Sequence, residues 1–325
     1  MEQFWTEELY EKAYDIVKNR RFPIVIPSCN RPNPIILNTF LKEDYNGDYW
    51  PVYFIVRNSQ EEEYRKSITR PNTYIVGFED NLIDDYGKAK QMCLDFAYSQ
   101  KFDYIFSLDD DLEDLGFNIL TKSGVGNPRA GSPDYKINNN KFLALWQLAS
   151  EICFNKYNVL YVSTNLKSTS WPIINVDQES SIKLISGKSP MQALNIKELH
   201  DKPYKFRSDK EVGFSDLDFI INLYANGDYT AMLPWLYYDM PADGVSLDNY
   251  PYYNSLKERL ITSMDKLFAL HPDKNFISRR DQKNKALGIL PGAGIKINTV
   301  RVRKNIGLEN YKHNVYKDIK EEYNI

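Results

Sequence analysis

Histidine and cysteine, on which many metal and nucleophilic sites depend, are scarce in this sequence. Its 325 residues include only three of each. Cys29, Cys93 and Cys153 are odd in number and far apart, so they show neither the spacing of a metal-ligand pair nor a disulfide framework. We therefore expect buried, reduced thiols in a cytoplasmic protein. Any catalytic or metal site has to rely mainly on carboxylates.

Long apolar runs and a large net charge are also lacking. No run approaches the roughly 18 apolar residues that cross a bilayer, and residues 2–21 predict an amphipathic helix rather than a signal peptide. Lys and Arg number 41 against 44 Asp and Glu, a net charge of −3, which argues against coating nucleic acid through charge alone. With 42% hydrophobic and 26% charged residues, the composition is that of a globular protein.

Apolar runs alternate with segments of helical spacing over the first 120 residues. The apolar runs occupy residues 22–27, 52–56, 73–76 and 104–108. This order predicts an α/β fold, Rossmann-like, with a mostly parallel sheet flanked by helices. Ligands of such sheets bind beyond the carboxyl ends of the strands. That rule places three segments along one rim, namely residues 28–31, 57–58 and 109–111.

Three consecutive carboxylates end the fourth apolar run, in the sequence YIFSLDDDLED. Asp109 and Asp111 are two residues apart, so in extended chain they point to the same side. Mg²⁺ and Mn²⁺ prefer oxygen ligands and complete their shell with substrate phosphates. The cluster favours a divalent-metal site at the rim over a solvated acidic turn.

Four segments in this order resemble the nucleotide-sugar-dependent glycosyltransferases of the GT-A fold, especially the family-2-like group. The segments are IVIPSCNRP at 24–32, the helix start YGKA at 86–89 before the aspartates, MQALNIKEL at 191–199, and FSDLDFIINLYANGDY at 214–229. The likeness covers about residues 22–240. The opening Pro-Ser-x-x-Arg-Pro is also similar to phage enzymes that modify hydroxymethylated DNA bases, including the TET-associated group, which would place the protein in a host cytoplasm.

The resemblance implies a donor and a metal. The donor is expected to be a UDP-sugar and the cation Mn²⁺ or Mg²⁺. The residues expected to contact the donor are Pro27, Ser28, Arg31, Arg57, Tyr86, Gly87, Lys88, Asp109 and Asp110. The expected metal ligands are Asp109, Asp111 and His271, with His313, Asp239 and Asp243 as rivals.

The resemblance also implies a general base if transfer inverts the anomeric centre. Asp216 is the first candidate and Asp218 the second, because both lie where the family carries its acidic pair. The family usually shows Glu-Asp there, whereas this chain shows Ser215 followed by Asp216. If transfer retains the configuration, Asp216 would bind the acceptor or the metal instead. Alternatively, Ser215 or Asp216 is only the N-cap of the helix.

Charge is unevenly distributed along the chain and suggests the acceptor. Between residues 273 and 304, nine basic residues stand against two acidic ones, a charge of +7 that leaves −10 on the rest. Clustered Lys and Arg neutralise phosphates, so DNA is the favoured acceptor, held through residues 274–304. A base inside a duplex would have to be flipped out. The alternatives are a polysaccharide or lipopolysaccharide acceptor, or a tail that only packs on the acidic body.

We predict one glycosyltransferase domain over residues 1–265. Its donor half spans about 22–120 and its acceptor half about 142–265, and a basic C-terminal extension over 266–325 packs on it. The glycine-rich segment 124–140 is either a lid or disordered. Three other functions stay open. A nucleotidyltransferase that makes nucleotide-sugars would normally show a Gly-rich loop, which residues 28–32 lack. A two-metal nuclease would need further acidic residues as ligands. A non-catalytic binding protein would not need carboxylates gathered at one rim.

Overall fold

The computed structural model describes most of the chain. The described residues are 7–39, 41, 48–117, 139–166, 182–184, 189–240, 253–284, 288–308 and 313–325. Asp243 and residues 124–138 of the glycine-rich segment lie outside them, so the predictions made for these residues are not addressed. Among the described helices, none is both long enough and apolar enough to cross a membrane.

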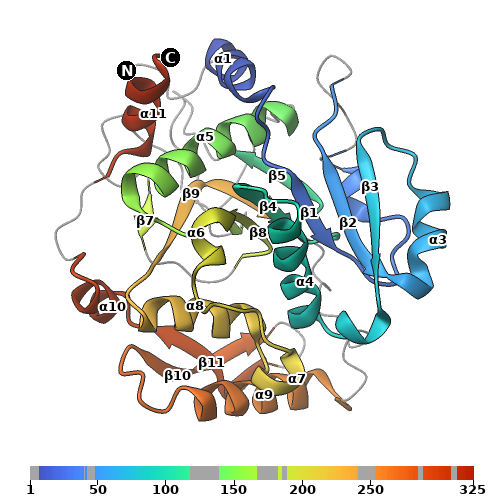
Figure 1. Ribbon diagram of the computed structural model, residues 1–325. Helices are drawn as coiled ribbons and strands as arrows, with labels where there is room; N and C mark the ends of the chain where they lie inside the picture. Colours follow the sequence, from blue (N-terminus) through green and yellow to red (C-terminus); the bar gives the residue numbers. More distant parts are fainter. Residues whose placement is uncertain are drawn as a thin grey trace.

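A single large sheet forms the centre of the described structure (Figure 1). Its order is β3-β2-β1-β4-β8-β6-β9-β5, with β7 paired to β9. The strands are β1 (Ile24–Pro27), β2 (Val52–Arg57), β3 (Thr73–Phe78), β4 (Tyr104–Leu108), β5 (Asp114–Phe117), β6 (Tyr161–Leu166), β7 (Lys183–Leu184), β8 (Met191–Asn195) and β9 (Thr230–Asp239). Strands β1 to β4, β6 and β9 share one direction, whereas β5, β7 and β8 run against it. The predicted α/β fold with a mostly parallel sheet is therefore confirmed.

Helices cover both faces of this sheet. The first face carries α1 (Glu7–Val17), α5 (Asn139–Tyr157) and α11 (Val315–Tyr323), and the second carries α4 (Tyr86–Ser99), α6 (Ile196–His200) and α8 (Ser215–Ala225). Strand β1 shows why two cores form. Ile24 and Ile26 enter the first core and Val25 enters the second, because successive side chains of a strand point to opposite faces. A strand buried on both sides has to be apolar throughout, as the sequence indicated.

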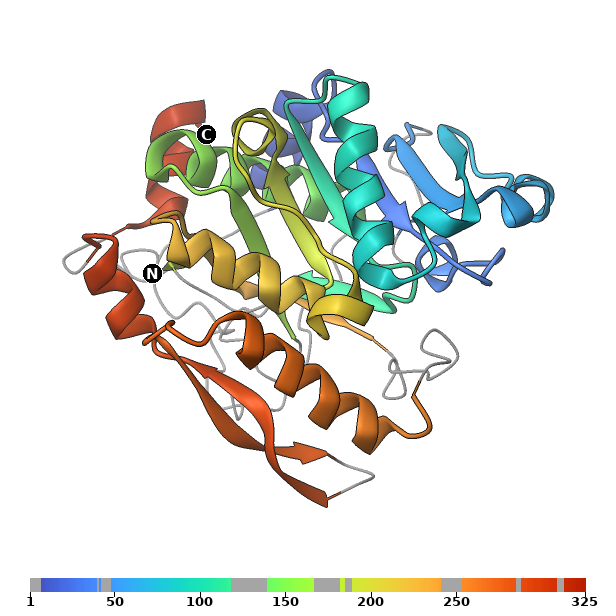
Figure 2. The ribbon, with the colours of Figure 1, turned by 60° about the horizontal axis from the view of Figure 1, so that its bottom comes forward.

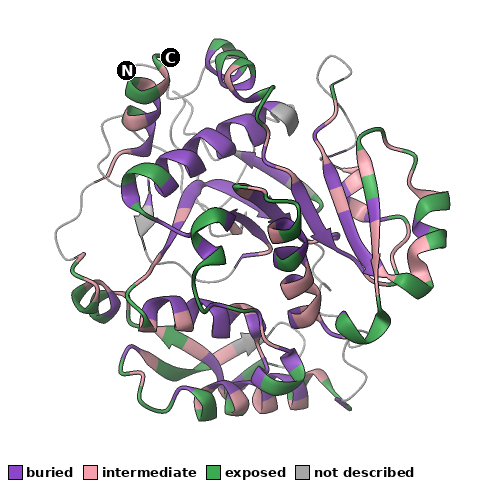
Figure 3. Cartoon of the chain, in the orientation of Figure 1, coloured by how far each residue is buried: buried purple, intermediate pink, exposed green. Residues whose placement is uncertain are grey.

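Shorter elements surround the sheet. Helix α3 (Asn58–Ser67) and the 3-10 turn η1 (Asp80–Leu82) flank the edge strand β3, α2 (Ile35–Asn38) follows β1, and α7 (Asp209–Val212) precedes α8. Burial is concentrated in the sheet and on the inward sides of its helices (Figure 3).

The C-terminal segment forms elements of its own. Helix α9 (Leu256–Leu270) leads into an antiparallel hairpin of β10 (Ile277–Asn284) and β11 (Gly288–Ile297), followed by α10 (Thr299–Asn305) (Figure 2). The inward side of the hairpin packs on the core that contains α8 and α9. The predicted boundary at residue 265 falls within α9, so the predicted C-terminal extension, residues 266–325, would begin midway along a helix.

Gly87 permits a close approach between the start of α4 and the segment before α8. A Cβ atom added there would lie 2.0 Å from the carbonyl oxygen of Arg207 and 2.8 Å from Cβ of Ser215. The first distance is to backbone, which cannot move aside as the end of a side chain can. Glycine at this position therefore sets how near the two helix starts can lie.

We expect Gly87→Ala to destabilise the protein by about 1–3 kcal/mol, because overpacking costs about that much. The sign of the change in unfolding free energy distinguishes the two effects, since replacing Gly by Ala within a helix otherwise stabilises a protein by roughly 0.5–1 kcal/mol. Gly227→Ala is the comparison for backbone strain without a clash, because Gly227 has a φ of +86° and no atom near the added Cβ, so we expect it to cost about 1–2 kcal/mol from its conformation alone. Urea denaturation measures both variants, and a Gly87→Ala protein as stable as the parent would contradict the proposed steric constraint.

Candidate active site

The sheet brings the predicted rim segments together. Strand β1 pairs in parallel with both β2 and β4, so their carboxyl ends meet. Ser28, directly after β1, donates from Oγ to Oδ2 of Asp110 at 2.5 Å. Arg31 places Nη1 2.6 Å from Oδ1 of Asp110 and 3.2 Å from Oδ2 of Asp111. Pro27 is the buried last residue of β1 and leads the chain into this contact.

Tyr64 of α3 completes this half of the site, and sequence reasoning did not find it. Its hydroxyl lies 2.7 Å from Ser28 Oγ and accepts from the backbone N–H of Arg31 at 2.9 Å. The side chain is fully buried. The signal in the sequence was one tyrosine in a helix whose other residues are all polar or charged. Tyr64 holds the turn after β1 in the conformation that delivers Arg31 to the aspartates.

Burial makes two of the aspartates difficult to ionise. It raises the pKa of Asp110 to about 6, although Arg31 and Ser28 oppose the rise. Burial and the charge of Asp109 raise the pKa of Asp111. Asp111 Oδ1 is buried and has no hydrogen-bond partner among the described residues. Asp110 thus has both oxygens engaged, whereas Asp111 keeps one buried oxygen available to a cation.

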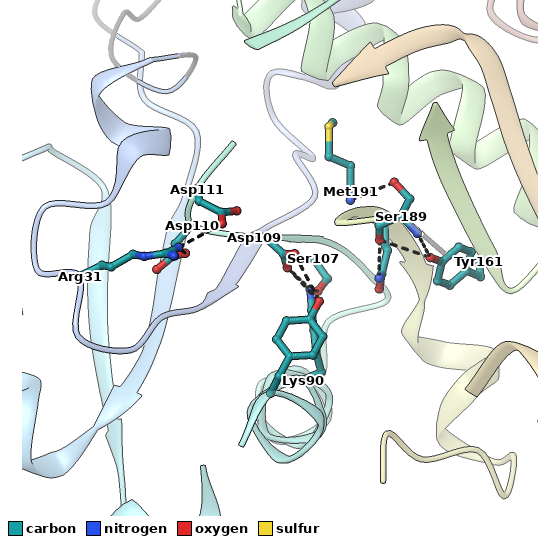
Figure 4. A network of polar contacts seen from close by, with 11 residues as sticks. Arg31, Lys90, Ser107, Asp109, Asp110, Asp111, Tyr161, Ser189 and Met191 are labelled. Carbon is teal, nitrogen blue, oxygen red and sulfur yellow. Dashed lines mark hydrogen bonds and ion pairs between the residues drawn. The ribbon is translucent and has the colours of Figure 1, made fainter. Parts of the chain in front are cut away.

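Asp109 is held by α4 rather than by the loop after β1. Lys90 Nζ lies 2.9 Å from Asp109 Oδ1 and 3.2 Å from Ser107 Oγ, and the Lys90 side chain is fully buried. Tyr86 donates its hydroxyl to Asp109 at 3.1 Å, and its ring lies over the Lys90 ammonium. Figure 4 shows Arg31 on one side of the aspartates and Lys90 on the other.

The predicted donor residue Lys88 lies elsewhere. Its ammonium contacts Asp84 at 2.7 Å and the carbonyl oxygen of Asn81 at 3.1 Å. Residues two apart on a helix are separated by about 200° around its axis, so Lys88 and Lys90 point in different directions. Arg57 likewise donates to the carbonyl of Ile83 at 3.4 Å. The structure therefore brings Lys90, which was not predicted, against Asp109 in the place expected for Lys88.

Asp218 and His271 contact each other. Asp218 is fully buried and accepts from Arg207 Nε at 2.8 Å, and His271 Nε2 lies 2.8 Å from its Oδ1. Burial favours a raised pKa, but the hydrogen bonds from His271 and Arg207 hold the pKa of Asp218 below its usual range. His271 ends α9, and the packing of α9 brings it to α8 rather than to Asp109 and Asp111, where a metal ligand was expected.

Asp216 of α8 is close enough to the aspartate cluster for its charge to act on Lys90. It is half-buried in the first turn, and its charge acts on the same groups as that of Asp109. Burial alone would lower the pKa of Lys90, but the charges of Asp109 and Asp216 raise it. Burial and the same two carboxylates raise the pKa of Tyr238 to about 12. The charges of both acids therefore act on Lys90, which links the carboxyl-end rim of the sheet to the start of α8.

Two buried carboxylates fix the starts of α4 and α8 relative to each other. Asp85 caps α4 by accepting from the N–H of Lys88 at 3.0 Å, and it also accepts from Ser208 Oγ and, at 3.2 Å, from the N–H of Asp209. Asp209 in turn accepts from the N–H of Ser215, the first residue of α8, at 2.8 Å. The aspartate side chains replace missing backbone partners at the helix starts. The position of Asp216 is thereby tied to that of α4.

A second polar group lies beside this cluster on β6 and β8. Tyr161 accepts from the N–H of Ser189 at 3.2 Å, and Gln192 donates to the Ser189 carbonyl at 2.8 Å (Figure 4). Gln192 pairs across the sheet with Ser107, the residue that contacts Lys90. Its Oε1 is buried and has no partner within the part of the chain that the structure describes.

Comparison with known proteins identifies a family for most of the chain. The sequence profile of the TET-associated glycosyltransferases matches residues 22–239. Among curated proteins, none matches the sequence.

Solved structures show a partial resemblance. S. aureus TarS is 15% identical in sequence, with a TM-score of 0.41. The match covers 76% of this chain and only 40% of the TarS chain. The second structure is glucosyl-3-phosphoglycerate synthase from Mycobacterium tuberculosis, solved with Mg²⁺ and UDP. It is 12% identical with a TM-score of 0.44, and the match covers 92% of this chain and 96% of the synthase chain.

We expect Lys90→Met to lower the free energy of unfolding by about 3 kcal/mol, because breaking a buried ion pair leaves Asp109 uncompensated. Lys88→Met is the matched control, since the same change two residues away removes only a partly exposed pair, worth about 0.5 kcal/mol. Urea denaturation distinguishes them. Equal small decreases would show that the Lys90 ion pair does not stabilise the site.

We expect Asp218→Asn to destabilise the protein by about 3–5 kcal/mol at pH 7, because Arg207 and His271 are then left without a charged partner. Because the pKa of Asp218 is lower in the folded protein than in the unfolded one, where it is about 3.9, the ionised side chain stabilises the fold at any pH above about 3.9. This stabilisation is lost as the pH falls through the pKa of the folded protein. The variant should therefore lose less stability than the parent on acidification below about pH 4. A parallel pH profile for both proteins would contradict the structural role of Asp218.

Proposed function

The chain belongs to the TET-associated glycosyltransferase family, and from this premise we propose that it moves a sugar from a UDP-sugar to a hydroxyl group of its acceptor. One observation carries the proposal. Asp109, Asp110 and Asp111 lie at the rim of the sheet between two cations, and the charge of Asp216 reaches the buried Lys90 from the start of α8. A diphosphate donor and an acceptor hydroxyl would meet between these groups.

Asp109 and Asp111 are the proposed ligands of Mn²⁺ or Mg²⁺. The fit rests on the buried Asp111 Oδ1 without a described partner and on the mutual repulsion that helps to raise the Asp111 pKa. A divalent cation relieves both, and oxygen donors are what it prefers. Within the described ranges no cluster of three or more His, Cys, Asp and Glu side chains could hold a metal, so the remaining positions would fall to diphosphate and water. When bound, the cation would neutralise charge on the departing diphosphate.

Other residues of the site orient the aspartates. Lys90 and Tyr86 orient Asp109, and Ser28 and Arg31 orient Asp110. Arg31 is one-third exposed, so its guanidinium can also reach a donor phosphate. These contacts exist before the donor arrives, which reduces the reorganisation needed for reaction.

Asp216 is the proposed general base for an inverting transfer. It would accept the proton of the acceptor hydroxyl as that oxygen attacks the sugar. Asp218 is a poor candidate, because Arg207 and His271 already bind it in a fully buried position. The caps through Asp85 and Asp209 hold the start of α8, and hence Asp216, at a constant place relative to α4.

A hydroxymethylated base in phage DNA is the favoured acceptor. The basic segment 274–304 supports it, since Arg280, Lys296, Arg301 and Lys304 are all exposed. A polysaccharide or lipopolysaccharide hydroxyl is the alternative acceptor. A nucleotidyltransferase is disfavoured by membership of a glycosyltransferase family.

We expect Asp111→Asn to lower kcat about 100- to 1000-fold with the fold retained, because removing one group that stabilises transition-state charge costs about that much. Glu113→Gln is the control, since Glu113 is acidic and exposed two residues away. Transfer of label from UDP-sugars to hydroxymethylated DNA or to glycans, at several Mn²⁺ concentrations, measures the decrease. Full activity of Asp111→Asn would refute the metal-assisted proposal.

A further inference from the structure

The solvent side of the β10–β11 hairpin is basic. Arg280 and Lys296 are exposed on it, and Lys304 is exposed on the following α10. None of the three has an ion-pair partner among the described residues. Arg279 differs, because it contacts Asp265 of α9 at 2.7 Å and lies over the ring of Phe268. The hairpin thus uses one arginine to attach to the body and presents other cations to solvent.

Ile289 is an exposed aliphatic residue near the turn of this hairpin. It is 63% exposed, whereas the next residue, Leu290, is 3% exposed. Neighbouring side chains of a strand point to opposite faces, so Leu290 points to the core and Ile289 to solvent. The register of the hairpin shifts between Arg280 and Gln282, and beyond this irregularity Ala293 and Ile295 pack on the core while Lys296 is exposed. A large apolar side chain at this place gains nothing from the fold of the described chain.

The turn end of the hairpin lies on the side of the proposed active site. Leu290 and Ala293 share a small core with Leu260 and with Phe214, the N-cap of α8. Phe214 is two residues from Asp216, and Leu290 packs against it, so the backbone of Ile289 lies near the end of α8 that carries the proposed base while its side chain faces solvent. Figure 2 shows the end of β10 and the start of β11 on the same side as the starts of α8 and α9.

We propose that the hairpin is a ribbon that holds a DNA duplex through its phosphates, with Ile289 as the wedge that unstacks the target base. The inference rests on the proposed DNA acceptor and names how the duplex is held. Strands of eight and ten residues extend about 25–33 Å, which matches roughly seven to ten base pairs. Apolar side chains inserted between base steps unstack them, and a base must leave the stack to react in an enzyme pocket.

Ile289→Ser tests the wedge. The acceptor is one oligonucleotide with a single hydroxymethylated base, offered either single-stranded or in a duplex. Transfer to the duplex should fall about tenfold, whereas transfer to the single strand should stay within about twofold, because only the duplex needs unstacking. The fluorescence of 2-aminopurine at the target position should rise on binding of the parent but not of the variant. Val300→Ser is the control, since Val300 is a 70% exposed aliphatic residue on α10.

The ribbon is tested by Arg280→Gln, Lys296→Gln and Lys304→Gln together. Fluorescence anisotropy of an unmodified duplex should show weaker binding. The slope of log affinity against log salt should become shallower by about 0.9 for each phosphate that the variant no longer neutralises. The charge-matched control changes three exposed lysines elsewhere, Lys12, Lys66 and Lys197, and should leave the slope unchanged.

The outcomes separate this inference from the proposed function. If the parent labels neither form of DNA, the proposed DNA acceptor fails. If it labels both forms and Ile289→Ser is unimpaired on the duplex, the wedge is overturned while the transferase function stands. An unchanged salt slope in the triple variant overturns the ribbon.

Discussion

The buried ion pair between Lys90 and Asp109 is the interaction on which the rest of the site depends. An ammonium without solvent access is stable in a protein only when a carboxylate and further acceptors surround it. Here Asp109 and Ser107 of the β4 end supply those partners, so α4 is bound to the sheet where the aspartates emerge. The same ammonium feels the charge of Asp216. The Lys90 ammonium thereby links α4 to the end of β4, and its charge interacts with that of Asp216 at the start of α8.

Packing around this pair gives each acidic residue a different environment. Asp110 is bound on both oxygens by Ser28 and Arg31, Asp111 keeps a buried oxygen without a described partner, and Asp218 is bound by Arg207 and His271. Carboxylates that look alike in the sequence therefore differ in burial and in partners, which is why we propose different roles for them. The close approach at Gly87 and the caps through Asp85 and Asp209 hold the starts of α4 and α8, and with them these environments, in fixed relative positions.

Charge is separated in space as well as along the chain. The acidic residues of the candidate site lie at the sheet rim, whereas the exposed cations of the C-terminal segment lie on α10 and on a hairpin that packs on α8 and α9. Repulsion between the acidic rim and a polyanionic acceptor would oppose binding near the site. Cations on an adjacent but separate element can offset that repulsion without neutralising the carboxylates.

Local patterns in the sequence determined the strands, their parallel order and the arrival of Asp109 to Asp111 at one rim, because apolar runs and residue spacing act over a few residues. The tertiary structure alone decided which helical lysine faces the site, since Lys88 and Lys90 differ only by a rotation of α4 that packing sets. It also paired Asp218 with His271, 53 residues away, and brought Tyr64 to Ser28 and Arg31. Such pairings join elements whose relative placement depends on the whole core, and no spacing within a segment encodes them.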